Sequence, residues 1–139
     1  MKTDFLDAHE RHWKDSELLF NNKRWANADH LYGMAAECGL KSLMVVFGMP
    51  FDTGKDRPTC NVDCKHIDRI QIRYETYRSG SPAGSGYALP DPTVFNNWDV
   101  SQRYAHSSHF NENLAIEHRN GTEAIRKLVQ QARREGLLK

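Results

Sequence analysis

The chain has 139 residues, a length typical of one domain that buries its own core, so a single domain over residues 1–139 is expected. The 19 basic and 18 acidic residues give a net charge of +1, which excludes a strong overall attraction to nucleic acid, and any RNA contact must be local. The longest apolar stretch, Leu43 to Phe47, is far shorter than the roughly 20 residues of a membrane-spanning helix. Because the first residues also lack a secretion-signal pattern, we expect a soluble cytoplasmic protein without membrane contact.

The first two predicted elements are helices. Apolar residues recur at helical spacing from Asp4 to about Asn21, with Thr3 or Asp4 available as the N-cap. A broader apolar stripe from Ala28 to Phe47 predicts a second helix that ends at Gly48. The short connection between these helices predicts that they pack as an antiparallel pair.

A loop and a third helix are expected next. The stretch from 51 to 61 contains glycine, proline and several polar residues, which are typical of a loop. Apolar residues from Ile67 to Tyr77 then repeat at steps of three and four, which predicts a helix with Asn61 or Asp63 as its cap.

The remaining elements complete a predicted all-α fold. Residues 79–92 contain several glycines, serines and prolines and are expected to form a flexible loop. Asn96 or Asn97 would cap a short helix, a break follows near Ser107-Ser108, and Asn113 opens the last long helix. The predicted architecture is therefore an antiparallel bundle of four longer helices plus a short helix.

The second helix also carries a resemblance to a known family. The residues that carry it are Ala35-Ala36-Glu37 and Leu40-Lys41-Ser42-Leu43 on this helix, followed by His66 and the pair Arg103-Tyr104. Through these residues the chain resembles the HEPN family (higher eukaryotes and prokaryotes nucleotide-binding domain) over about residues 4 to 136. The resemblance implies a HEPN-like helical bundle that forms a homodimer and acts on RNA or a nucleotide. Glu37 itself, a carboxylate on an otherwise apolar helix, is expected to anchor a buried polar network rather than to face solvent.

The catalytic branch of that family implies a specific site. In that branch an arginine is followed a few residues later by a histidine, and here five residues separate Arg103 from His109. The resemblance implies a metal-independent ribonuclease without a cofactor. A neutral imidazole is able to take the proton of an RNA 2′-hydroxyl, whereas a guanidinium holds the phosphate. His109 is therefore expected to be the base and Arg103 the phosphate-binding residue.

Helical geometry leaves a rival base open. Six positions at about 100° per residue place Arg103 and His109 roughly 240° apart on one unbroken helix, so a chain break or a partner subunit must bring them together. His106 lies three positions after Arg103, shares its face and is the second candidate base. Alternatively, Arg103 forms only a surface ion pair with Asp99, and His109 is merely exposed.

Three functions therefore follow from the sequence. The leading one is a HEPN-like RNA-directed protein, in catalytic form an endoribonuclease of toxin or defence type that would pair with an antitoxin. The alternative is a noncatalytic module that binds a nucleotide or docks a partner such as a nucleotidyltransferase. The third is a metal site built from Cys60, Cys64 and His66, with Cys38 or another histidine as a fourth ligand. The spacing is unlike common zinc sites, so we expect no metal and three free thiols.

Overall fold

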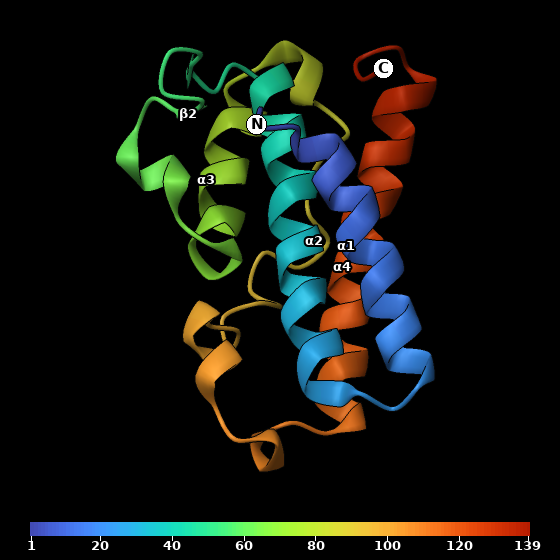
Figure 1. Ribbon diagram of the computed structural model, residues 1–139. Helices are drawn as coiled ribbons and strands as arrows, with labels where there is room; N and C mark the ends of the chain where they lie inside the picture. Colours follow the sequence, from blue (N-terminus) through green and yellow to red (C-terminus); the bar gives the residue numbers. More distant parts are fainter.

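Four long helices make up most of the computed structural model, which describes residues 1–139 (Figure 1). They are α1 (Phe5–Asn21), α2 (Trp25–Val46), α3 (Ile67–Ser79) and α4 (Glu112–Arg134). The predicted all-α class is confirmed. No helix combines the length and the apolar character that crossing a membrane requires.

The first two helices form the expected antiparallel pair (Figure 1). Asp4 is the N-cap of α1 and accepts a hydrogen bond from the backbone N–H of Asp7 at 2.9 Å, as its position in the sequence predicted. Helix α2 ends before Gly48, whose φ of 103° lies in the region that favours glycine.

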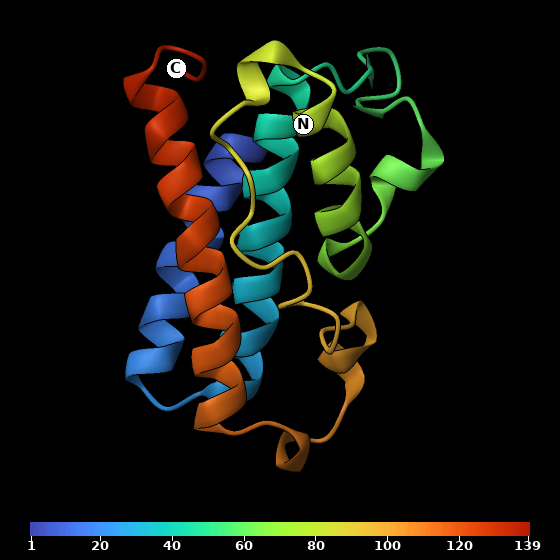
Figure 2. The ribbon, with the colours of Figure 1, turned by 180° about the vertical axis from the view of Figure 1, so that it is seen from behind.

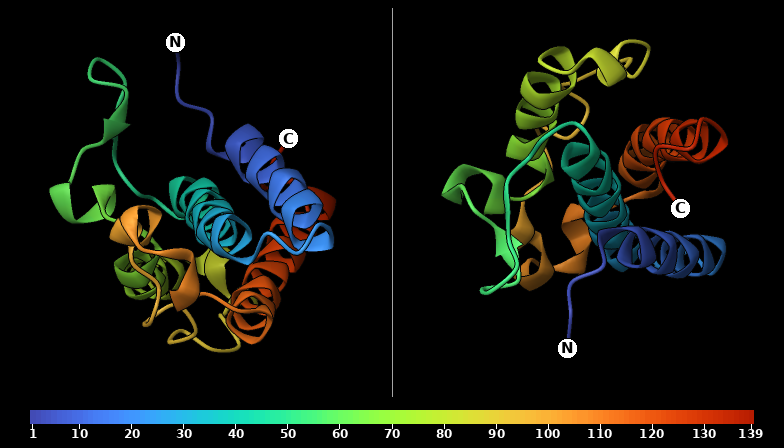
Figure 3. Two further views of the ribbon diagram at one scale, coloured as in Figure 1. Left: turned by 60° about the horizontal axis from the view of Figure 1, so that its bottom comes forward. Right: turned by 90° about the horizontal axis from the view of Figure 1, so that it is seen from above.

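Helix α2 is the centre of the bundle. Figure 3 shows it between the other three helices, each of which contacts it directly. Leu40, Leu43 and Met44 on α2 are fully buried and pack in one core with residues of α3 and α4. Several polar side chains on α2, among them Asp29, Glu37 and Lys41, are therefore buried beside other elements.

Helix α3 begins differently from the prediction. Its N-cap is His66, whereas Asn61–Cys64 form a separate 3-10 helix. The predicted capping by Asp63 is wrong because its fully buried carboxylate accepts hydrogen bonds from Arg73 Nε at 2.7 Å and from the Tyr77 hydroxyl at 2.6 Å. The loop before it also contains a small antiparallel hairpin, β1 (Phe51–Asp52) and β2 (Arg57–Pro58), that the sequence did not predict.

The segment 79–92, predicted as a flexible loop, contains a short helix and a buried side chain near its middle. A 3-10 helix spans Pro82–Gly84, and the Tyr87 side chain after it is buried. The Tyr74 hydroxyl donates to the Tyr87 carbonyl at 2.6 Å, and the Tyr87 hydroxyl donates to Glu135 at 2.7 Å. The continuation of this segment, yellow in Figure 2, crosses between α3 and α4.

Two short 3-10 helices, Val100–Tyr104 and Ser107–His109, replace the predicted short helix. Asp99 caps the first of them, with Gln102 completing a capping box. Asn96 and Asn97 do not cap it because their side-chain oxygens contact Gln71 and His118, each at 2.8 Å.

Helix α4 begins close to the predicted position. Asn111 is its N-cap and accepts a hydrogen bond from the backbone N–H of Leu114 at 2.9 Å, two residues before the predicted opening at Asn113. The predicted break at Ser107-Ser108 lies earlier, at Ala105 and His106, because Ser107 and Ser108 belong to the second 3-10 helix.

Candidate functional site

The predicted catalytic residues Arg103, His106 and His109 all lie on the exposed segment between α3 and α4. Arg103 and His109 belong to two separate 3-10 helices, so the angle calculated for one unbroken helix does not apply to them. His106 accepts a hydrogen bond at Nδ1 from the backbone N–H of Ser108 at 3.1 Å. No ion pair joins Arg103 to Asp99, and the Arg103 guanidinium instead lies 4.8 Å from the ring centre of Tyr104.

A buried tryptophan brings two other histidines together near Arg103. Trp98 is 1% exposed, and its ring centre lies 5.6 Å from that of His30 and 6.5 Å from that of His66. The His30 ring is stacked on the indole at an interplanar angle of 13°. His30 comes from α2 and His66 precedes α3, so Trp98 joins two elements that are distant in the sequence. We call His30, His66, Trp98 and Arg103 the histidine face.

The position of Trp98 depends on a glycine of α2. A Cβ atom at Gly33 would lie 2.1 Å from the Trp98 ring, so only glycine allows the indole to sit this close to the helix. The indole N–H donates to the backbone carbonyl of Asp29 at 3.2 Å.

Glu37 raises the pKa of His66. Its side chain is nearly buried and lies 2.8 Å from His66 Nδ1, and its other oxygen accepts a hydrogen bond from the buried Lys41 ammonium at 3.0 Å. This arrangement confirms the prediction that Glu37 anchors a buried polar network. The hydrogen bond and the negative charge of Glu37 favour the imidazolium form of His66, whereas partial burial opposes it less strongly.

The pKa of His30 is shifted in the opposite direction to that of His66. Its pKa is lowered chiefly by burial, which disfavours the charged ring, and further by the positive charge of Arg103. Nδ1 of His30 is buried and has no hydrogen-bond partner, so protonation of the ring would leave a buried N–H without an acceptor. His12 of α1, whose pKa is also lowered by burial, acts on His30 electrostatically and therefore borders the same region.

A network around the fully buried Asp29 and His118 holds the histidine face to α4. Asp29 of α2 contacts His118 Nδ1 at 2.5 Å with one oxygen and accepts from Gln102 Nε2 at 2.7 Å with the other. Asp29 thereby fixes both Trp98 and the helix that carries Arg103. Sequence reasoning missed His118, although it falls within the apolar face of the last helix at Leu114, Gly121 and Ile125, and a polar residue on such a face is the available signal.

The alternative metal ligands are not gathered into one site. The Cys64 thiol lies 3.5 Å from the Pro58 carbonyl, and His66 Nδ1 contacts Glu37. No group of three or more histidine, cysteine, aspartate or glutamate side chains is arranged to hold a metal ion, and all three cysteines are unpaired.

The histidine face combines two imidazoles with opposite pKa shifts and one guanidinium, which are the groups required for acid–base chemistry on a phosphate ester. Comparisons of the chain with protein-family models, curated proteins and solved structures found no match. The function is therefore inferred from the geometry of this face.

Proposed function

We propose that the chain is an RNA-directed, HEPN-like protein that cleaves RNA without a metal ion. The observation that supports this most is the pair of histidines whose rings both lie next to Trp98, one with a lowered pKa and one with a raised pKa. A neutral histidine accepts a proton and a charged one donates a proton at the same pH, so the two divide the roles of general base and general acid.

The proposed reaction uses both roles in one step. His30 takes the proton of an RNA 2′-hydroxyl, the 2′-oxygen attacks the neighbouring phosphorus, and the bond from phosphorus to the 5′-oxygen breaks. His66 gives its proton to the departing 5′-oxygen, while Glu37 holds the opposite ring nitrogen. Arg103 neutralises the charge on the phosphate oxygens. The products are a 2′,3′-cyclic phosphate and a free 5′-hydroxyl.

Tyr104 supports single-stranded RNA as the substrate. Its side chain is 79% exposed although it is aromatic, and it lies directly beside Arg103. Exposed aromatic rings next to arginine provide stacking surfaces for unpaired bases, whereas a paired base in a duplex cannot reach such a surface.

His106 and His109 remain candidates from the family resemblance. The geometry favours His30 and His66 over them because His106 and His109 are both exposed and neither contacts a carboxylate. A homodimer in which a second copy supplies His109 remains a proposal that follows from the resemblance.

The test is cleavage of a fluorescent single-stranded RNA in excess chelator, with detection of 2′,3′-cyclic ends. We expect His30→Gln and His66→Gln each to lower the rate by at least about 100-fold, and Arg103→Lys to lower it as well because lysine lacks the planar fork of donors. His106→Gln and His109→Gln are the matched comparisons, and each removes a histidine from the adjacent segment.

Three results would contradict parts of this proposal. Full activity in His30→Gln and His66→Gln, with loss in His109→Gln, would return the site to the pair Arg103 and His109. Loss only in His106→Gln would move the base to that residue. An intact RNA after incubation with the wild type, across single-stranded and hairpin substrates, would reject the ribonuclease and favour the noncatalytic binding module.

A further inference from the structure

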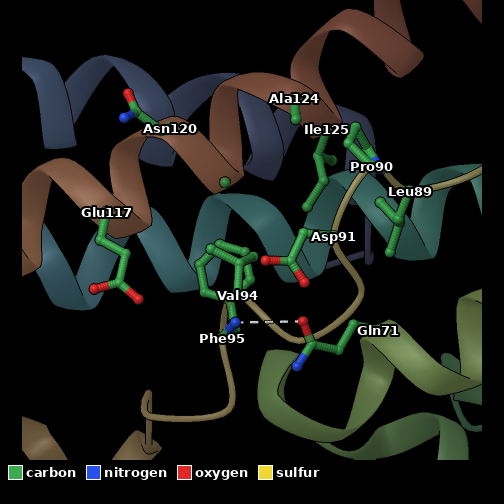
Figure 4. Close-up of a pocket in the computed structure, with 11 residues that line it drawn as sticks. Gln71, Leu89, Pro90, Asp91, Val94, Phe95, Glu117, Asn120, Ala124 and Ile125 are labelled. Atoms are coloured by element: carbon green, nitrogen blue, oxygen red, sulfur yellow. Dashed lines mark hydrogen bonds between the residues drawn. The ribbon is translucent and has the colours of Figure 1, made fainter.

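A pocket of about 300 Å³ lies on a part of the molecule that shares no residue with the histidine face. It is bounded by α3, by the segment that crosses between α3 and α4, and by α4 itself (Figures 2 and 4). Its volume is at the lower end of the range for small-molecule sites, and its apolar wall is formed by Leu89, Pro90, Val94, Phe95 and Ile125.

The wall of this pocket is fixed by buried contacts. A Cβ atom at Gly121 would lie 2.8 Å from Val94, so this glycine allows the crossing segment to approach α4 closely. The Phe95 ring stacks on His118 with ring centres 5.3 Å apart, and Gln71, itself 1% exposed, donates to Asn96 at 2.8 Å. The pocket is therefore preformed and does not need a ligand to order it.

The charge on its lining has one sign. Asp91 and Glu117 are the charged residues among the eleven that line the pocket, and no lysine, arginine or histidine is among them. Figure 4 shows their carboxylates on either side of Val94 and Phe95. Hydrogen bonds from the Thr93 hydroxyl and backbone N–H lower the pKa of Asp91, which keeps this carboxylate charged at neutral pH. An anionic ligand such as a nucleotide phosphate would be repelled here.

We propose that this pocket binds a small organic cation with a planar apolar body, such as an aryl amidinium or aryl ammonium compound. The body would pack against Leu89, Val94 and Ala124, which are partly exposed in the pocket, and the cationic end would be attracted by the carboxylates of Asp91 and Glu117. Gln71 adds a buried amide whose oxygen accepts only one long hydrogen bond, 3.4 Å from the backbone N–H of Phe95, and retains capacity for a donor on the ligand. The inference does not depend on the proposed ribonuclease activity.

The test compares two probes of nearly equal shape and opposite charge. Benzamidine and benzoate are titrated separately into the ¹⁵N-labelled full chain, and amide shifts are followed by NMR. We expect saturable shifts for Phe95, Asn120 and Gly121 with benzamidine, and binding at least about fivefold weaker for benzoate. Equal affinity for the two probes, or shifts confined to other parts of the chain, would overturn the proposal.

Variants separate the contributions of charge and space. Asp91→Asn and Glu117→Gln are expected to weaken benzamidine binding without changing the thermal unfolding temperature, because both side chains are exposed at the pocket rim. Asp15→Asn removes one equal, exposed charge from α1, which contributes no residue to the pocket, and serves as the control. Ala124→Leu, which fills the space, should abolish the shifts while circular dichroism remains that of the wild type. Unchanged benzamidine affinity in both carboxylate variants would reject the assigned charge recognition.

Discussion

At the scale of a single residue, Glu37 raises the pKa of His66. Its two oxygens are divided between Lys41 and His66, so one nearly buried carboxylate balances a buried ammonium and also favours the charged imidazole. A buried ion pair contributes little net stability because desolvation offsets the attraction, but removal of one partner is costly. In the proposed reaction, Glu37 is therefore a positioning residue for His66 rather than a group that touches RNA.

Replacement of Glu37 by glutamine tests this role directly. We expect the pKa of His66 in Glu37→Gln to fall towards its ordinary value because the amide still accepts a hydrogen bond but carries no negative charge. The measurement is the pH titration of the His66 ring signal by NMR. Asp68→Asn, which removes a weaker electrostatic contribution to the same histidine, should lower the pKa less. A His66 pKa that is the same in Glu37→Gln and in the wild type would contradict the role assigned to Glu37.

At the scale of elements, the fit of Trp98 against α2 decides where the segment after α3 lies. Gly33 leaves the space for the indole, and Asp29 one turn earlier accepts its N–H. The sequence pattern predicted α1, α2 and α4 because long amphipathic helices repeat the same spacing several times. It did not predict the two 3-10 helices after Trp98, because short elements lack such a repeat and depend on tertiary contacts.

Gly33→Ala tests the importance of this close approach. Alanine stabilises a helix interior relative to glycine by about 1 kcal/mol, so local preference alone would favour the substitution. We expect the opposite, a loss of roughly 1–3 kcal/mol, because the added methyl group would overlap the Trp98 ring. Urea unfolding measures the change, and Gly54→Ala, in the turn between β1 and β2 where the nearest side-chain atom is 3.4 Å away, is the control for a methyl group added without overlap. A more stable Gly33→Ala protein would show that the indole moves aside at little cost.

At the scale of the whole molecule, side-chain contacts join the first and last helices of the bundle. Arg119 of α4 donates to both oxygens of Glu17 on α1, at 2.7 and 3.0 Å, and the Tyr32 hydroxyl of α2 donates to the same carboxylate at 2.7 Å. Three helices therefore meet at one carboxylate. The hydrogen bond with Arg119 is the largest influence on Glu17 and lowers its pKa in the folded state.

The lowered pKa of Glu17 gives this contact a defined dependence on pH. The contribution of this contact to the free energy of unfolding is present above the pKa of an unfolded glutamate, about 4.3. It is lost as the pH falls through the lower pKa of Glu17 in the folded state. Arg119→Met should therefore reduce the free energy of unfolding by about 1 kcal/mol at neutral pH, with a smaller difference in acid. Denaturant unfolding at several pH values measures this. The control is Arg11→Met, which removes a more exposed ion pair with Asp7 at 3.9 Å and should change the free energy of unfolding little. If Arg119→Met lowers the free energy of unfolding by the same amount at all pH values, the explanation is contradicted.

The candidate site was only partly predictable because its residues converge from distant parts of the chain. Glu37 was identified as a network residue since a carboxylate stood alone on an apolar helix, and Arg103 was identified through the family resemblance. His30 and His66 were not paired because neither motif spacing nor helical periodicity relates α2 to the start of α3. Their proximity results from Trp98, which enters the core from a third segment.

The Asp29–His118 contact also sets the order in which the histidine face is completed during synthesis. Helix α2 emerges from the ribosome early and is able to pair with α1 through local contacts, whereas His118 belongs to the last helix. Until α4 docks, Asp29 and Asn97 both lack their contact with His118, so the segment with Trp98 is joined to Asp29 of α2 but not yet to α4. A nascent chain thus carries His30 and His66 before Asp29 has its buried partner on α4, so we expect the histidine face to reach its final geometry only after the last helix has packed.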